Sequence, residues 1–110
     1  MCILLIETRA AIDHIQEICK VGGVDCMVIA PFDLSTDLGV SGRLDAPELL
    51  EAITYAERAI LASGIALGGA ALTQEQTQTL LKRGYRVLGH HFDVLILKQF
   101  VQQTVAWRIV

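Results

Sequence analysis

CILLI at residues 2–6 and VDCMVIA at residues 24–30 are the two stretches that decide the fold. Continuous apolar runs of this length are typical of strands that are covered on both faces in a parallel sheet. Between them, over residues 9–20, apolar residues return every three or four positions, and Gly22 and Gly23 follow as a stop signal. The sequence therefore predicts a strand, an amphipathic helix and a second strand that ends at Pro31.

The remainder of the chain repeats this order. Residues 32–46 form a long connection rich in Asp, Ser, Thr and Gly, which indicates a functional loop. A capping box at residues 45–48, with Asp45 as N-cap, predicts a helix to about Ser63 that is stopped by Gly64. Strands are predicted at residues 65–71 and 85–89. Further helices are predicted from a second capping box at Thr73 to residue 84, and from Asp93 past residue 100.

Four successive strand–helix units predict an α/β fold with a parallel sheet, since crossovers between parallel strands place helices on the faces of the sheet. We expect one domain over residues 1–110. The spacing of the units is close to that of half a TIM-type (β/α)8 barrel. A free-standing, open four-stranded sheet is the alternative, and strand periodicity leaves both open.

The amino-acid composition indicates which kinds of partner and which cell compartment to expect. The chain is 53% hydrophobic and 19% charged, with a formal net charge of −3, so we expect a folded, soluble protein without nucleic-acid or membrane partners. The longest uncharged stretch, residues 59–74, is shorter than the ~20 apolar residues of a bilayer span. The three cysteines are predicted to be buried, reduced side chains. Together with an N-terminus that lacks a basic signal-peptide region, they indicate the cytoplasm.

Candidate site residues follow the predicted strands, because ligands of parallel α/β sheets bind outside the carboxyl ends of the strands. Glu7 and Asp33 stand there, and two such carboxylates suit a hard divalent cation such as Mg²⁺ or Mn²⁺. The alternative is structural: Glu7 caps a helix or forms a salt bridge near Arg9, and Asp33 forms an Asx-turn to the backbone near Ser35. The residues alone favour this alternative.

Other chemistries find less support in the sequence. All three lysines fall on predicted helices, which argues against Schiff-base catalysis, and the glycine motifs of dinucleotide and P-loop sites are absent. One residue of the pair His90–His91 is a candidate ligand or base. The favoured alternative is that His90 packs in the interior and His91 hydrogen-bonds in the loop. An anion site at Gly68, Gly69 and the helix that begins at Thr73 is a third possibility.

Several motifs together resemble one enzyme family. They are LIETRAA at residues 5–11, GVD at residues 23–25 and PFDLSTDLG at residues 31–39. The chain is similar to the HpcH/HpaI aldolase and citrate lyase family, the class II, metal-dependent pyruvate aldolases. The resemblance covers nearly all of the chain and only the carboxyl-terminal half of the family barrel. It implies a carboxyl-terminal half-barrel that acts as a carbon–carbon lyase on a small 2-oxo acid.

The resemblance also implies roles for individual residues. Glu7 and Asp33 would be the protein ligands of a divalent cation, Mg²⁺ or Mn²⁺, that chelates pyruvate. Backbone groups around Pro31, Phe32 and Asp33 would hold the substrate carboxylate. The family usually has glutamine at the position of Leu5 and alanine at that of Phe32. Its base histidine and its carbonyl-polarising arginine belong to the other half of the barrel.

A half-barrel leaves two strand edges unpaired, so we expect the chain to associate with itself or with a complementary half. The family's use of a C-terminal helix at subunit contacts implies that residues 93–105 are a contact surface. Two functions therefore stay open. The first is an aldolase that is incomplete or degenerate as an isolated chain, and the second is a non-catalytic half-barrel whose role is assembly.

Overall fold

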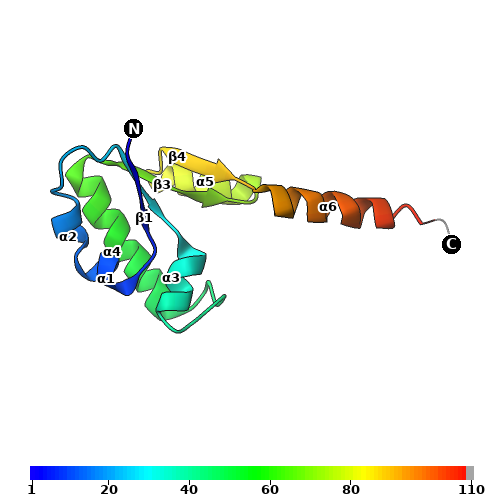
Figure 1. Cartoon of the computed structure of the whole chain (residues 1–110), viewed down its shortest axis with the longest axis horizontal. Helices are drawn as coiled ribbons and strands as arrows, with labels where there is room; N and C mark the ends of the chain where they lie inside the picture. The colour runs from blue at the N-terminus through cyan, green and yellow to red at the C-terminus, as the bar shows by residue number, and fades with distance from the viewer. Residues whose placement is uncertain (109–110) are drawn as a thin grey trace.

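Four parallel strands form one sheet, as predicted, and their order in the sheet is β1-β2-β3-β4 (Figure 1). The structure is a computed structural model and describes residues 1–108. Its elements are β1 (Ile3–Ile6), α1 (Arg9–Asp13), α2 (Ile15–Ile18), β2 (Cys26–Ile29), α3 (Pro31–Asp37), α4 (Pro47–Ser63), β3 (Ala66–Ala71), α5 (Gln74–Lys82), β4 (Val87–His90) and α6 (Asp93–Val105).

The core lies between the sheet and the helices that follow it. The side chains of Ile6, Ile29 and Leu67 point from the strands toward Leu49 and Ile60 of α4, and all five are buried. The prediction that the strands are covered on both faces is wrong for β1, because its alternate residues, Ile3 and Leu5, are exposed. Helices cover one face of the sheet, and the opposite face of β1 is left open.

The structure differs from the sequence prediction at two helices. The single helix predicted for residues 9–20 is divided at His14, whose backbone lies outside the helical region and whose ring bonds the carboxylate of Glu17. The connection at residues 32–46 was expected to be a loop, but its first part forms α3. Pro31 occupies the first turn of that helix, where the missing N–H is not needed.

Helix ends follow the local chemistry. Gly64 ends α4 in the left-handed conformation, as predicted. Thr73 caps α5 by accepting from the amide of Gln76, as predicted, and the Gln76 side chain accepts from the amide of Leu72. Asp45 is not the N-cap of α4. Because residues that precede proline favour extended backbone, Ala46 takes that position before Pro47.

A buried polar network joins α4 to the segment before β4. The Tyr85 hydroxyl donates to the Glu57 carboxylate over 2.6 Å, and the Arg83 guanidinium lies 2.7 Å from the same carboxylate. The Tyr85 ring also packs on Gly69, where an added Cβ would lie 2.7 Å from a ring carbon. This network fixes β4 and α4 relative to β3.

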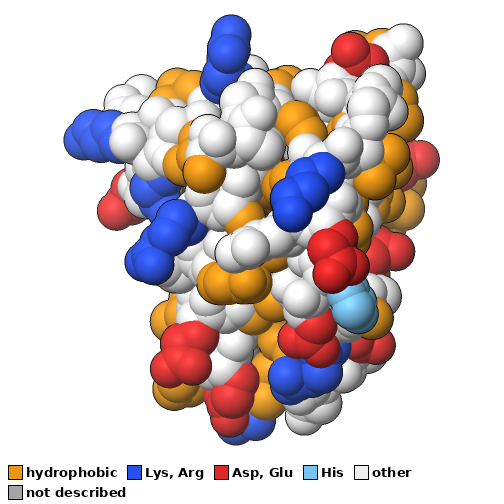
Figure 2. Space-filling model, turned by 90° about the vertical axis from the view of Figure 1, so that its left-hand side faces the viewer, with side chains coloured by type: hydrophobic (Ala, Val, Ile, Leu, Met, Phe, Trp, Pro, Cys, Tyr) orange, Lys and Arg blue, Asp and Glu red, His pale blue; other side chains and the backbone are white. Residues whose placement is uncertain are grey.

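The surfaces of the molecule differ in character. Figure 2 shows acidic and basic side chains interspersed among scattered apolar ones on the side that carries α1, α2 and α4. By contrast, α6 extends away from the sheet as a separate arm (Figure 1). None of its residues is buried. Its exposed apolar side chains are Val94, Ile96, Leu97, Phe100, Val101 and Val105.

The composition predicts that no helix spans a membrane and that the cysteines are buried, reduced side chains. Within residues 1–108, no helix combines the length and the apolar character needed to cross a bilayer. All three cysteines are free thiols, but burial was predicted correctly only for Cys26. Cys2, which lies just before β1, is exposed, and Cys19 is half-buried.

Candidate metal and substrate site

The two predicted carboxylates lie at the same edge of the sheet. The parallel register pairs Ile6 with Ile29, and the amide of Ala30 donates to the carbonyl of Ile6 over 3.1 Å. Glu7 follows β1 directly, and Asp33 lies in the first turn of α3, just after β2. The Glu7 side chain is half-buried and the Asp33 side chain is exposed.

Neither structural alternative for these carboxylates is present. In the part of the chain that the structure describes, no ion pair includes Glu7 or Asp33. The carboxylate near the start of α1 is that of Asp37, which accepts from the Arg9 amide over 2.7 Å. Ser35 donates its hydroxyl to the carbonyl of Phe32. Glu7 and Asp33 are therefore both available to a ligand.

Ser35 organises the loop beside Asp33. Its fully buried hydroxyl donates to the carbonyl of Phe32 over 2.6 Å and accepts from the amide of Gly42 over 3.0 Å. The sequence identified Ser35 as an edge residue but gave no signal for the contact with Gly42, which is seven residues away. The first turn of α3 has no side-chain cap, and Leu34 donates its amide to the carbonyl of Ala30. The amides of Phe32 and Asp33, as the second and third helical residues, have no partner within the helix.

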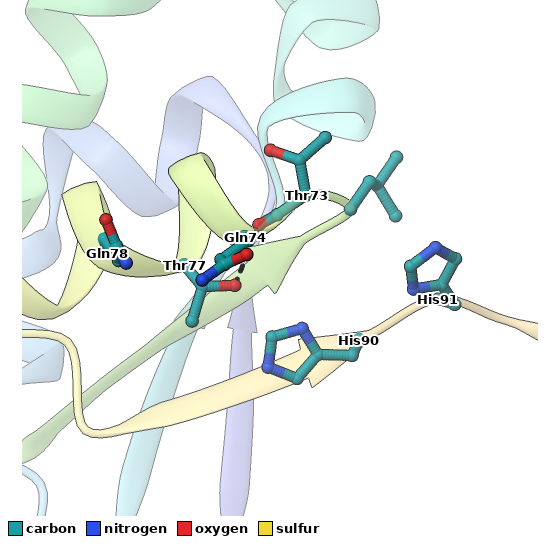
Figure 3. Close-up of a pocket in the computed structure, with 7 residues that line it drawn as sticks. Thr73, Gln74, Thr77, Gln78, His90 and His91 are labelled. Atoms are coloured by element: carbon teal, nitrogen blue, oxygen red, sulfur yellow. Dashed lines mark hydrogen bonds between the residues drawn. The ribbon is translucent and has the colours of Figure 1, made fainter.

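The histidine pair lies away from these carboxylates, beside α5. His90 and His91 line an open cavity of about 470 Å³ with Leu72, Thr73, Gln74, Thr77 and Gln78 (Figure 3). The expectation that His90 packs in the interior is wrong. Its side chain is exposed at the outermost strand, and its Nδ1 lies 3.2 Å from the carbonyl of Ala71. His91 is half-buried and has left-handed backbone, with φ of 60°.

The donor set around Glu7 and Asp33 fits a hard cation. Among the described residues, no three His, Cys, Asp or Glu side chains come together to form a metal site. Mg²⁺ is commonly held by one or two carboxylates, with water and substrate oxygens completing its octahedron. Two carboxylates at one edge, free of ion pairs within residues 1–108, match that pattern.

Comparison with known proteins places the chain in a family. The family model described as HpcH/HpaI aldolase/citrate lyase matches residues 1–99. A hydroxypyruvate/pyruvate aldolase of Roseovarius nubinhibens is 38% identical over 98% of this chain and 43% of its own length. A 2-keto-3-deoxy-L-rhamnonate aldolase of Escherichia coli is 31% identical over 96% of this chain and 40% of its own length.

The solved structures agree with this result. An HpcH/HpaI aldolase from Desulfitobacterium hafniense superposes with a TM-score of 0.86 and 28% identity, over 94% of this chain and 40% of the aldolase. The chain thus spans about 40% of the length of the relatives it matches. The α/β fold class is confirmed as four parallel β/α units of a TIM-type barrel. On these grounds, the chain belongs to the HpcH/HpaI aldolase/citrate lyase family.

Proposed function

We propose that the chain forms part of a metal-dependent aldolase, a carbon–carbon lyase that acts on a small 2-oxo acid through a pyruvate enolate. The observation that carries the proposal is the placement of Glu7 and Asp33 at the carboxyl ends of neighbouring parallel strands, free of ion pairs within residues 1–108. The names of the relatives, hydroxypyruvate/pyruvate aldolase and 2-keto-3-deoxy-L-rhamnonate aldolase, support the substrate class.

Each site residue has a separate role in this proposal. Glu7 and Asp33 hold the cation, and the amides of Phe32 and Asp33 orient the substrate carboxylate. Pro31 has no N–H to donate, but it fixes the backbone at the start of α3. When bound, Mg²⁺ or Mn²⁺ supplies Lewis-acid stabilisation of the developing enolate oxygen.

The reaction requires groups beyond those of this chain. A base removes a proton from C3 of pyruvate, and the resulting carbon nucleophile forms a bond to the aldehyde carbon, whose oxygen takes up a proton. The reverse reaction breaks the same bond. In our proposal the base and a carbonyl-polarising arginine come from four further β/α units, because the chain spans about 40% of its relatives.

The same observations support a proposal about assembly. Residues 1–110 act as one domain, the carboxyl-terminal half of a barrel, which closes with a complementary half or with a second copy. Support comes from the outer edges of β1 and β4, which pair with no strand within residues 1–108, and from the open apolar face that carries Ile3 and Leu5. The exposed apolar side chains of α6 supply a further contact surface for a homo-oligomer.

We place the protein in the cytoplasm. Three free thiols, at Cys2, Cys19 and Cys26, suit a reducing compartment.

Deuterium exchange at the methyl group of pyruvate tests the function. The chain is incubated in D2O with pyruvate and Mg²⁺ or Mn²⁺, and loss of the methyl proton signal is followed by NMR. With the buffer as the base in place of the absent one, we expect slow metal-dependent exchange that disappears in Glu7→Ala and in Asp33→Ala and persists in the control Glu75→Gln on α5. Exchange that persists in both site variants contradicts the proposed site.

The experiment also decides between the two functions. The unpaired strand edges favour, as a second candidate, a non-catalytic half-barrel whose role is assembly. Absence of exchange with either metal, together with a stable dimer by light scattering, supports that candidate and refutes catalysis by the isolated chain.

A further inference from the structure

The carboxylate of Asp37, at the end of α3, holds the start of α1. Its Oδ2 accepts from the amide of Arg9, the first residue of that helix, over 2.7 Å. Asp37 lies four residues after Asp33 on α3, and Arg9 lies two residues after Glu7. The bond therefore joins the two short segments that carry the proposed ligands of the cation.

The Arg9 amide has no partner inside its own helix, because the first amides of a helix lack a carbonyl one turn back. The N-cap residue, Thr8, bonds a different amide: its hydroxyl accepts from Ala11 over 3.1 Å. Asp37 thus supplies the acceptor that the start of α1 lacks. A charged acceptor of this kind makes a stronger hydrogen bond than a neutral one.

A second hydrogen bond joins the same two segments on the other side of Glu7. At the end of the ladder between β1 and β2, the amide of Ala30 donates to the carbonyl of Ile6 over 3.1 Å. Only Glu7 and Thr8 lie between this bond and α1. The backbone around the two carboxylates is therefore closed into a ring, by the ladder bond before Glu7 and by Asp37 after it.

This ring sets the distance between the two proposed ligands. Neither Glu7 nor Asp33 is held by an ion pair within residues 1–108, so their separation depends on the backbone that carries them. Mg²⁺ demands near-ideal octahedral geometry, which two loosely placed carboxylates do not provide. Among the described residues, no three acidic side chains gather into one metal site, which leaves Asp37 outside the pair.

We infer that Asp37 is a positioning residue, which holds Glu7 at the separation from Asp33 that a shared divalent cation requires. It acts through its bond to the backbone of Arg9. The inference rests on the proposed function and adds a residue to its metal site. The stretch PFDLSTD at residues 31–37 then combines two roles on one short helix, since Asp33 binds the cation and Asp37 fixes the segment that carries the other ligand.

Mn²⁺ binding to the full chain, followed by electron paramagnetic resonance, tests the inference without requiring turnover. Asp37→Ala is expected to weaken binding by about tenfold, as loss of a residue that orients a metal ligand commonly does. Asp37→Asn keeps an oxygen that accepts from the amide. It should restore the affinity to within about threefold of wild type, because a neutral acceptor bonds with roughly half the strength.

Arg9→Pro removes the same bond from the donor side. Proline lacks the N–H and is common at the first position of a helix, and the extended backbone of Thr8 suits a residue that precedes proline. Arg9→Ala is its control, because it keeps the amide and removes only the guanidinium. We expect Arg9→Pro to bind Mn²⁺ about tenfold more weakly than Arg9→Ala. Adding Asp37→Ala to Arg9→Pro should weaken binding no further, since both remove one bond.

Asp25→Ala is the matched control for Asp37→Ala. Asp25 also accepts from a backbone amide, that of Cys2 over 2.6 Å, but this contact lies at the opposite end of β1 from Glu7. Each variant loses one bond between an aspartate and an amide, and urea unfolding measures the stability that each loses. We expect Asp25→Ala to keep the Mn²⁺ affinity of the wild type, whereas a merely structural role for Asp37 predicts the same affinity in both variants.

The outcomes separate the inference from the metal site on which it rests. Wild-type affinity in Asp37→Ala, an equal loss in Asp25→Ala, or no recovery in Asp37→Asn overturns the inference while the metal site stands. If circular dichroism shows that Asp37→Ala is unfolded, equal affinities of Arg9→Pro and Arg9→Ala overturn it instead. If the wild type does not bind Mn²⁺, or if Glu7→Gln and Asp33→Asn both bind it as the wild type does, the proposed metal site is refuted and the inference falls with it.

Discussion

Replacing Tyr85 by phenylalanine tests whether the network between α4 and β4 holds the sheet together. The Tyr85 hydroxyl is buried and donates over 2.6 Å to the Glu57 carboxylate, whose side chain is itself only 10% exposed. A hydrogen bond to a charged group contributes about 2 kcal/mol when its loss leaves the partner under-satisfied. We therefore expect Tyr85→Phe to lower the free energy of unfolding by about 2 kcal/mol at pH 7.

The same substitution has a defined pH dependence. Burial, followed by the hydrogen bond and the charge of Glu57, raises the pKa of Tyr85 well above its ordinary value of 10.0. Above pH 10 the unfolded chain loses the phenolic proton while the folded chain keeps it, so the wild type loses stability as the pH rises. At pH 11 this loss is about 1.4 kcal/mol, and the difference between wild type and variant shrinks to about 0.6 kcal/mol.

Urea unfolding at matched protein concentration, at pH 7 and pH 11, measures both values. Tyr55→Phe is the control, because Tyr55 is exposed on α4, and we expect a change within about 0.5 kcal/mol at either pH. A Tyr85→Phe effect below about 0.5 kcal/mol at pH 7, or one that is the same at both pH values, refutes this reasoning.

Three further predictions address the sheet, the loop and the arm. Gly69→Ala should lower the free energy of unfolding by about 1–3 kcal/mol in urea titrations, because the added Cβ would lie 2.7 Å from the Tyr85 ring. Gly22→Ala is the control, since the space around Gly22 is open and the free energy of unfolding should change little. Ser35→Ala should lower the free energy of unfolding by about 1–3 kcal/mol in the same assay, because the Ser35 hydroxyl bonds Phe32 and Gly42, and it should weaken Mn²⁺ binding. An unchanged free energy of unfolding would contradict the role of Ser35 in the loop. Phe100→Glu should lower the molar mass measured by light scattering if α6 joins subunits, and an unchanged mass would exclude that contact.

Local signals predicted most of the fold. Gly64 and Thr73 end and begin helices through interactions within a few residues, which is why their roles could be predicted from sequence. The loop prediction for residues 32–46 is wrong at α3, because Pro31 is typical of the end of a strand and is also common in the first turn of a helix. The bond between Ser35 and Gly42, which fixes the loop after α3, has no sequence signature.

The placement of the candidate site followed from strand order alone. Parallel strands bring their carboxyl ends to one edge, so Glu7 and Asp33 were expected on the same side of the sheet, as observed. The partnership of Glu57 with Tyr85 was not predicted, since 28 residues separate them and no periodic pattern links them. The exposure of Leu5 was also missed, because an apolar run does not reveal which of its faces lacks a covering layer.

Electron paramagnetic resonance of Mn²⁺ is the most direct test of our proposal that Glu7 and Asp33 share one cation. We predict that the chain binds one ion, and that Glu7→Gln and Asp33→Asn each weaken binding by at least about tenfold. Glu75→Gln should bind as the wild type does. Wild-type affinity in both Glu7→Gln and Asp33→Asn would contradict the account.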